Sequence, residues 1–239
     1  MMDIGIHVVK TVKIFGFDLW ITESMVNVWL IGLVLIIAAL IIRRKILKPK
    51  KIPAGVQNVI EWIVELLDKF TISTMGEKGK KFSSFYGCMF IFILVCNLSG
   101  LLIGPTFNNG RFDINFLRPP TADASVTFAL SLITFFMVQG FGIKVKGVGK
   151  WAKGLTEPLW PMTPLNVIGE LANPVSLSFR LFGNILGGTI IMTLYYNLPW
   201  FALVGIPAAL HGYFDLFAGV LQAFIFVMLS MTFVSSAME

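Results

Sequence analysis

Charged residues are scarce in this sequence of 239 residues: they make up 13% of it, whereas hydrophobic residues make up 56%. A soluble domain carries about 25% charged residues, so this composition and a mean hydropathy of +0.81 exclude a soluble globular fold. Several apolar runs approach or exceed the ~20 residues that a helix needs to cross a bilayer. The sequence therefore predicts an all-α polytopic membrane protein.

Other features are missing or nearly so. The two cysteines, Cys88 and Cys96, lie in one apolar segment and are expected to be free thiols that act as small apolar residues. No glycine-rich phosphate-binding motif is present, so nucleotide chemistry would belong to partners, and we expect no cofactor and no resident metal. The net charge of +6 comes from basic residues in short loops, which the positive-inside rule explains without a nucleic-acid partner.

The whole chain, residues 1–239, is expected to be one membrane domain. Its predicted segments are an external N-terminus (1–25), a first span (26–42), an amphipathic helix on the cytoplasmic surface (56–74), a second span (82–104), a third span (121–143) and two long helices (165–197 and 200–236). The last two exceed the ~20 residues of an upright span, and strong tilt would absorb the excess. Because Leu198-Pro199 separates them, we expect a tilted C-terminal hairpin that lines a water-filled region.

Basic residues predict which loops face the cytoplasm. Residues 43–51 hold six positive charges and no acid, and residues 144–153 hold four lysines. Residues 105–118 are nearly balanced in charge. By the positive-inside rule, the first two segments are cytoplasmic and the third is external, and the basic run at 43–51 can also bind lipid headgroups. The N-terminus should then lie outside and the C-terminus in the cytoplasm.

Arg180 lies in the middle of segment 165–197, with no acidic residue within nine positions on either side. A guanidinium stays charged at any working pH, and in mid-membrane it costs about 3 kcal/mol on insertion scales and roughly 10–17 in simulations of isolated helices. Steps of three or four place further polar or small residues on its helical face, namely Asn173, Ser176, Asn184 and Gly187. Together with Gly187, Gly183 and Gly188 would let another helix approach closely. An intramembrane charge indicates function by default. The alternatives are that Arg180 snorkels, which suits helix ends better, or that it forms a purely structural ion pair with an acid elsewhere in the chain.

Isolated polar residues mark three other segments. Asn97 is the one strongly polar residue inside the second span. Such an amide more often forms a hydrogen bond between packed helices than part of a functional site. At the start of the third span, Thr121 fits a helix N-cap with Asp123 as an acid in the first turn, so Asp123 either supports the helix end or is functional. In the last segment, one helical face carries Asp215, Gly219 and Gln222.

Several motifs taken together resemble one family. Pro174-Val-Ser-Leu-Ser-Phe-Arg180-Leu-Phe-Gly-Asn184, followed by Leu221-Gln222-Ala-Phe-Ile-Phe226, is similar to subunit a of the F-type ATP synthases. Three further pieces look like the same family and occur in its order: Asn97-Leu-Ser-Gly-Leu-Leu102, Arg118-Pro-Pro-Thr-Ala-Asp123, and Glu170 ten residues before the arginine. The set spans about residues 20–236, so the resemblance covers most of the chain.

The resemblance implies both a fold and a function. The implied fold has an upright first helix, a surface helix, two more upright spans and a long tilted hairpin against a rotor ring. The implied function is that of a non-catalytic stator channel, which passes H+ or Na+ through two half-channels to and from carboxylates of the c-subunit ring, so that rotation drives ATP synthesis elsewhere. The implied partners are the c-ring, the peripheral-stalk b subunits, the rest of the complex and the lipid of a bacterial plasma membrane.

The resemblance also implies roles for single residues. Arg180 would be the essential stator arginine, with Asn184 and Gln222 orienting it and lining the aqueous route. The other positions implied in ion translocation are Glu170, Asp123, Asn97, Asp215, Thr189 and His211. The sequence departs from the family at Thr189 and Asp215, where many members carry an acid and a histidine in one order or the other. We expect these two residues, Gln222 and Arg180 to form a polar ladder in the external half-channel. If the ion is Na+, Asp215 and Thr189 would supply oxygen ligands to it. The alternative is that Asp215 only bonds His211.

Two other functional classes fit part of the sequence. A secondary transporter could use Arg180 to bind its substrate, but it would predict repeats or broken helices in two halves, and no second copy of the Arg180 pattern is present. A purely structural membrane scaffold would leave Arg180 unexplained. The choice between H+ and Na+ stays open, because the neighbours of the ring carboxylate decide it.

Overall fold

The computed structural model describes residues 8–14, 17–46, 55–102, 106–108, 111–113, 119–156, 160–196 and 206–238. Its helices are α1 (Glu23–Ile46), α2 (Val56–Met75), α3 (Ser83–Leu102), α4 (Ala124–Lys146), α5 (Val148–Thr156), α6 (Thr163–Tyr196), α7 (Ile206–His211) and α8 (Ala218–Met238), with a π-helical segment (Gly212–Phe217) between the last two. Single 3-10 turns lie at Glu77–Lys81, Pro120–Ala122 and Trp160–Met162. Within these residues, five helical stretches are long and apolar enough to cross a membrane, which confirms the all-α polytopic fold class.

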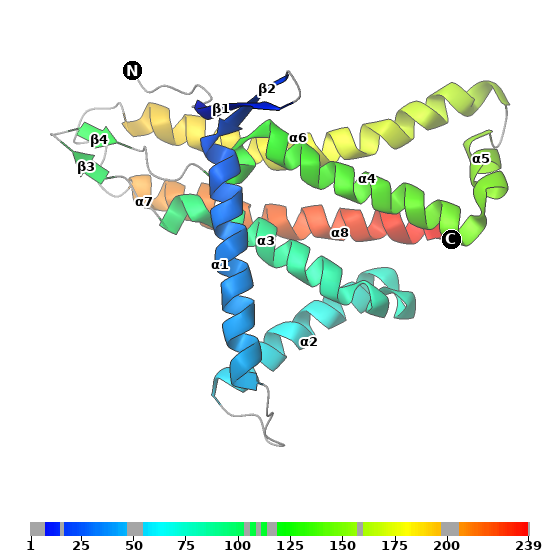
Figure 1. The fold of residues 1–239 in the computed structure, drawn as a ribbon, viewed down its shortest axis with the longest axis horizontal. Coiled ribbons are helices and arrows are strands. Elements are labelled where there is room, and N and C mark those ends of the chain that lie inside the picture. Colours follow the sequence, from blue (N-terminus) through cyan, green and yellow to red (C-terminus); the bar gives the residue numbers. More distant parts are fainter. Residues whose placement is uncertain are drawn as a thin grey trace.

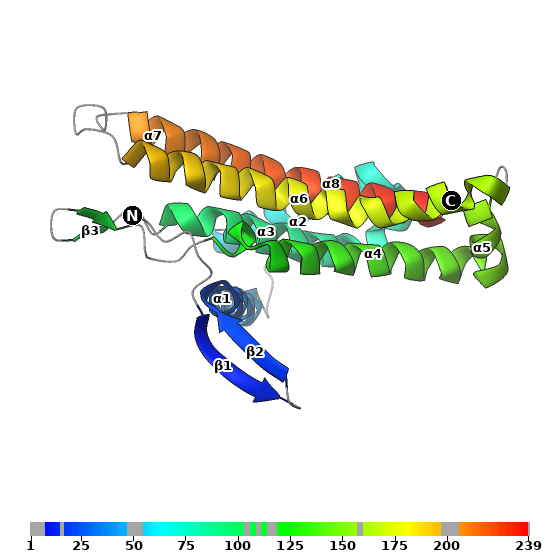
Figure 2. The same cartoon turned by 90° about the horizontal axis from the view of Figure 1, so that it is seen from above.

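The long helices form two stacked layers. Figure 2 shows α6 and α8 side by side in one layer, above α3 and α4 in the other. In Figure 1, α1 crosses the direction of α4, α6 and α8 at a steep angle. Helices α3 and α4 thus follow the direction of the C-terminal hairpin more closely than that of α1, and the tilt of each helix in the membrane stays a prediction.

The core lies between the two layers. Its fully buried apolar side chains come from α3, α6 and α8 and include Ile93, Leu177, Leu181, Phe226, Val227 and Met231. Hydroxyl pairs tie α4 to the hairpin: Thr127 lies 3.2 Å from Ser178 of α6, and Thr134 lies 2.9 Å from Ser230 of α8. Apolar lipid gives helices little reason to associate, so packing and hydrogen bonds of this kind hold a membrane bundle together.

The outer elements differ in how they meet the bundle. The C-terminal half of α2 packs through Phe70, whose ring stacks on Phe224 of α8 at 4.8 Å, while Val59 and Trp62 in its N-terminal half are exposed. The helix runs over Val56–Met75, one residue beyond the predicted surface helix. Helix α1 is longer than the predicted span 26–42 at both ends and exposes most of its apolar side chains, as expected of a helix surrounded by lipid or partners.

Two small hairpins were not predicted. Strands β1 (Val8–Ile14) and β2 (Phe17–Thr22) pair antiparallel, as do β3 (Thr106–Asn108) and β4 (Arg111–Asp113). β1 is rich in β-branched residues, which favour strands, so its composition could have indicated a strand. The predicted Asn-Asn-Gly turn at residues 108–110, the break at Leu198-Pro199 and residues 47–51 of the basic run lie partly or wholly outside the described residues.

Charged segments gather at one end of the two-layer bundle. The end of α4, α5 and the C-terminus lie together at one end, and β3 and β4 lie at the other (Figure 1). Lys144 and Lys146 are in the last turn of α4, and Lys153 is in the last turn of α5. This arrangement agrees with loops 144–153 and 105–118 facing opposite sides, although the assignment of a side to each remains a prediction.

Candidate functional site

Arg180 lies at the centre of α6, seventeen residues from its first residue and sixteen from its last. Its side chain is exposed in the isolated chain, as are those of Ser176 one turn earlier and Asn173 two turns earlier. Space beside Gly183 and Gly187 is open, because a Cβ added at either would meet no atom within 4 Å. Within the described residues Arg180 forms no ion pair and no hydrogen bond. A permanent charge at the centre of the helix is thus exposed beside two small residues, and we call Arg180, Gly183 and Gly187 the exposed strip of α6.

Three amides, two of them buried and one half-buried, belong to α8 or bond to its first residues. The Asn184 amide of α6 donates to the Ala218 carbonyl at 3.4 Å, and the Asn97 amide of α3 donates to the Gly219 carbonyl at 2.8 Å. Gln222 of α8 is 6% exposed. Its Nε2 and the Oδ1 of Asn97 are buried without a hydrogen-bond partner in the described part of the chain. Buried polar groups are nearly always satisfied, so each of these two atoms is a place where a bound water molecule would complete the hydrogen bonding.

A carboxylate–imidazole pair lies where α7 meets the π-helical segment. Asp215 contacts Nδ1 of His211 one turn earlier, and both side chains are about one quarter exposed. The contact that the sequence offered as an alternative is therefore present. Thr189 of α6 donates to the Ile185 carbonyl of its own helix at 2.9 Å. A Cβ on Gly188 would lie 3.2 Å from the side chain of Phe214, so this glycine lets α6 approach the π-helical segment closely.

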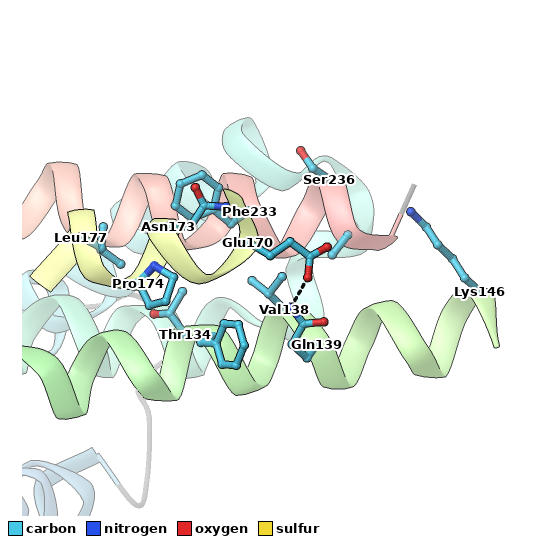
Figure 3. A pocket seen from close by; sticks show the side chains of 12 residues that line it. Thr134, Val138, Gln139, Lys146, Glu170, Asn173, Pro174, Leu177, Phe233 and Ser236 are labelled. Atoms are coloured by element: carbon cyan, nitrogen blue, oxygen red, sulfur yellow. Dashed lines mark hydrogen bonds between the residues drawn. The ribbon is translucent and has the colours of Figure 1, made fainter. Parts of the chain in front are cut away.

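Glu170 faces a pocket at the other end of the hairpin. The pocket has a volume of about 280 Å³ and is lined by α4, α6 and α8, with polar groups from Thr134, Gln139, Lys146, Glu170, Asn173 and Ser236. Figure 3 shows the Glu170 carboxylate pointing to Gln139 across the pocket; Nε2 of Gln139 donates to Oε2 of Glu170 at 2.7 Å. Pro174 has no N–H to bond the Glu170 carbonyl within the helix, which adds a polar group on this side of α6.

The start of α4 corrects one prediction. Asp123, not Thr121, is the N-cap, because Oδ1 of Asp123 accepts from the Ser125 N–H at 2.9 Å. Thr121 instead belongs to the preceding 3-10 turn at Pro120–Ala122. The prolines at 119 and 120 favour that turn, because they fix φ and cannot donate. Of the two roles left open for Asp123, the structure shows the support of a helix end.

The structure adds Gln139, Lys146 and Trp151 to the residues considered from sequence. Gln139 is an amide inside a predicted span, the same signal that marked Asn97, and it could have been found in that way. No sequence pattern pairs it with Trp151, because a loop and a change of helix direction separate them. Within the described residues, no three acidic, histidine or cysteine side chains are grouped so that they could hold a metal ion.

Comparison with known proteins gives consistent matches. Residues 25–235 match the family described as ATP synthase A chain. The chain is 36% identical over 227 residues to "ATP synthase subunit a, sodium ion specific" of Propionigenium modestum, a match that covers 94% of this chain and 76% of that protein. It is 33% identical over 230 residues to "ATP synthase subunit a" of Staphylococcus aureus, with 93% of both proteins covered.

Proposed function

Because the chain belongs to the ATP synthase A chain family, we propose that it conducts ions along two half-channels that meet at Arg180. The chain is a multi-pass, ion-translocating stator subunit of the membrane sector, and it is not the catalytic part of that complex. In the proposal, its partners are a ring of carboxylate-bearing c subunits on the exposed strip of α6, and peripheral-stalk b subunits elsewhere on its surface. The transported ion is H+ or Na+.

The exposed position of Arg180 is the observation that carries this proposal. A permanent charge at the centre of a membrane helix needs a counter-charge, and the described residues supply none. A partner carboxylate at ~4 Å would gain roughly 4 kcal/mol in an effective dielectric near 20, which lowers the pKa of that carboxylate. A ring site that arrives protonated or ion-loaded is thereby driven to release its ion, and the fixed positive charge blocks passage from one half-channel to the other.

The carboxylates of Asp215 and Glu170 lie toward opposite ends of the C-terminal hairpin, which supports two separate half-channels. Asp215, His211 and Thr189 would line the external route, which continues past Asn97, Asn184 and Gln222 toward Arg180. Glu170 and Asn173 would line the cytoplasmic route, which opens at the end of the bundle that carries Lys146 and α5. Ten helical residues separate Glu170 from Arg180, a rise of about 15 Å. Asp123 contributes to this arrangement by fixing the start of α4.

Replacement of Arg180 tests the proposal. We expect Arg180→Ala to abolish ion-driven ATP synthesis and to let ions leak passively through the membrane sector, because nothing then separates the half-channels. Arg180→Lys should also fail to couple, since an ammonium can lose its proton when buried and cannot present a planar fork. The measurements are ATP synthesis and passive ion flux in sealed vesicles, with Val34→Ile, at an exposed position of α1, as the control. Full synthesis with Arg180→Lys would contradict the assigned role.

A further inference from the structure

A chain of hydrogen bonds links α5 to the acid of the pocket. The indole Nε1 of Trp151 donates to Oε1 of Gln139 at 3.0 Å, and Nε2 of Gln139 donates to Oε2 of Glu170 at 2.7 Å. An indole N–H can only donate, and an ionised carboxylate can only accept. The Gln139 amide must therefore turn its oxygen to Trp151 and its nitrogen to Glu170. Trp151 and Glu170 therefore require the same orientation of the Gln139 amide, and each hydrogen bond stabilises the other.

The local fold explains how Trp151 reaches α4. Gly147 has a φ of 79°, and its N–H donates to the Ile143 carbonyl at 2.9 Å, which ends α4. This left-handed conformation favours glycine, and it lets α5 begin one residue later and fold back. The Cδ1 atom of Trp151 then lies 3.5 Å from the position that a Cβ of Gly142 would occupy. The tight turn and the bare backbone at Gly142 together place the indole next to Gln139.

Helix α5 is also tied to α6 at a second point, away from Glu170. The Asn166 amide donates to the Leu155 carbonyl at 2.9 Å. Among the described residues that line the pocket, Lys146 of α4 is the one charged side chain besides Glu170, and the α8 residues in the lining, Phe233, Ser236 and Ala237, are uncharged. Glu170 forms no ion pair with any described residue, so its direct side-chain support comes from Gln139.

We propose that Gln139, held by Trp151, is a positioning residue that keeps the Glu170 carboxylate turned into the pocket for ion transfer. This inference rests on the proposed place of Glu170 in the cytoplasmic route. Without the amide, the carboxylate can rotate away from the pocket axis, and ion transfer slows.

The test uses the intact synthase in inverted vesicles, where ATP-driven ion uptake starts at the cytoplasmic face. Gln139→Met keeps the volume and removes both hydrogen bonds, so we expect uptake to fall two- to fivefold. Trp151→Phe keeps an aromatic ring and removes only the indole donor, so it should lower uptake by a smaller factor. Asn166→Ala breaks the other hydrogen bond between α5 and α6 and should leave uptake unchanged.

A double-mutant cycle separates positioning from general support of the fold. If Gln139 acts through Glu170, Gln139→Met should have no further effect on uptake in a Glu170→Gln background. An additive loss in the double mutant, or a loss of uptake with Asn166→Ala equal to that of Trp151→Phe, would overturn the inference. If Gln139→Met fails to assemble, Trp151→Phe and its cycle with Glu170→Gln decide the question in the same way.

The same variants distinguish failure of the inference from failure of the proposed function. Normal uptake in Glu170→Gln would remove Glu170 from the route, and the proposed role of the pocket would fail with it. Impaired uptake in Glu170→Gln, together with wild-type rates in both Gln139→Met and Trp151→Phe, would leave the route intact and refute only the positioning role.

Discussion

Glu170 and Asp215 lie toward opposite ends of the C-terminal hairpin, and their carboxylates are held in different ways. Glu170 accepts a hydrogen bond from α4, through an amide that α5 holds in turn. Asp215 contacts His211, one turn away in the same stretch of helix. A carboxylate tied to two other helices keeps its position only while those helices stay docked, whereas one tied to its own turn moves with that turn.

The difference shows two ways of building a polar site in a membrane. The Glu170 pocket needs tertiary structure, because its supporting groups come from a different helix and from beyond a tight turn at Gly147. The Asp215 cluster needs a local distortion instead. The segment Gly212–Phe217 is a π-helix, a feature that often marks functional sites, and Gly188 of α6 makes room for it at Phe214. Substitutions in α4 or α5 should therefore change the position of the Glu170 carboxylate and leave that of Asp215 unchanged.

The largest effect in this comparison is expected at Asp215. Asp215→Asn keeps the shape and the hydrogen-bonding capacity but removes the charge, so we expect coupled ion transport to fall about tenfold or more while the complex still assembles. The companion change His211→Gln keeps a polar neighbour and leaves the carboxylate in place, so it should retain a larger share of transport. The measurement is ATP-driven ion uptake in vesicles with equal amounts of the subunit. Normal transport with Asp215→Asn would remove this acid from the pathway and leave Glu170 as the one functional cluster.

The comparison also predicts that the two clusters open to opposite sides. With Cys88 and Cys96 replaced, single cysteines at Lys150 and Arg111 should react with a membrane-impermeant reagent from opposite faces of sealed vesicles, because α5 and the β3–β4 hairpin lie at opposite ends of the bundle (Figure 1). The lysines predict that position 150 is cytoplasmic. Labelling of both positions from the same face would contradict the topology and the separation into two half-channels.

How much of this could be predicted from sequence depends on where the signals lie. The fold class and the central position of Arg180 follow from long apolar runs broken by one charge, which are properties of the chain itself. The direction of α3 and α4 relative to α1 could not be predicted, because apolar composition specifies a helix and not its tilt. The link from Trp151 through Gln139 to Glu170 could not be predicted either, since it depends on how α5 folds back after Gly147. Asn184 and Gln222 were expected near Arg180 from family resemblance, and their roles remain proposals.

The smallest effect is expected at Asp123, a third acid, which serves as a helix cap. Its Oδ1 accepts from the Ser125 N–H at 2.9 Å, and an asparagine at this position can accept the same bond. Asp123→Asn should therefore keep both thermal stability and ion transport close to those of the wild type, whereas Asp123→Ala should cost about 1 kcal/mol of stability through the lost cap. Thermal unfolding of the purified complex and ion uptake in vesicles measure the two properties separately. A cap loses stability only when the hydrogen bond is lost, but a proton-transfer acid loses function as soon as its charge is removed. Severe loss of transport in a stable Asp123→Asn protein would thus place this carboxylate with Asp215 and Glu170, and the comparison would have to include three acids instead of two.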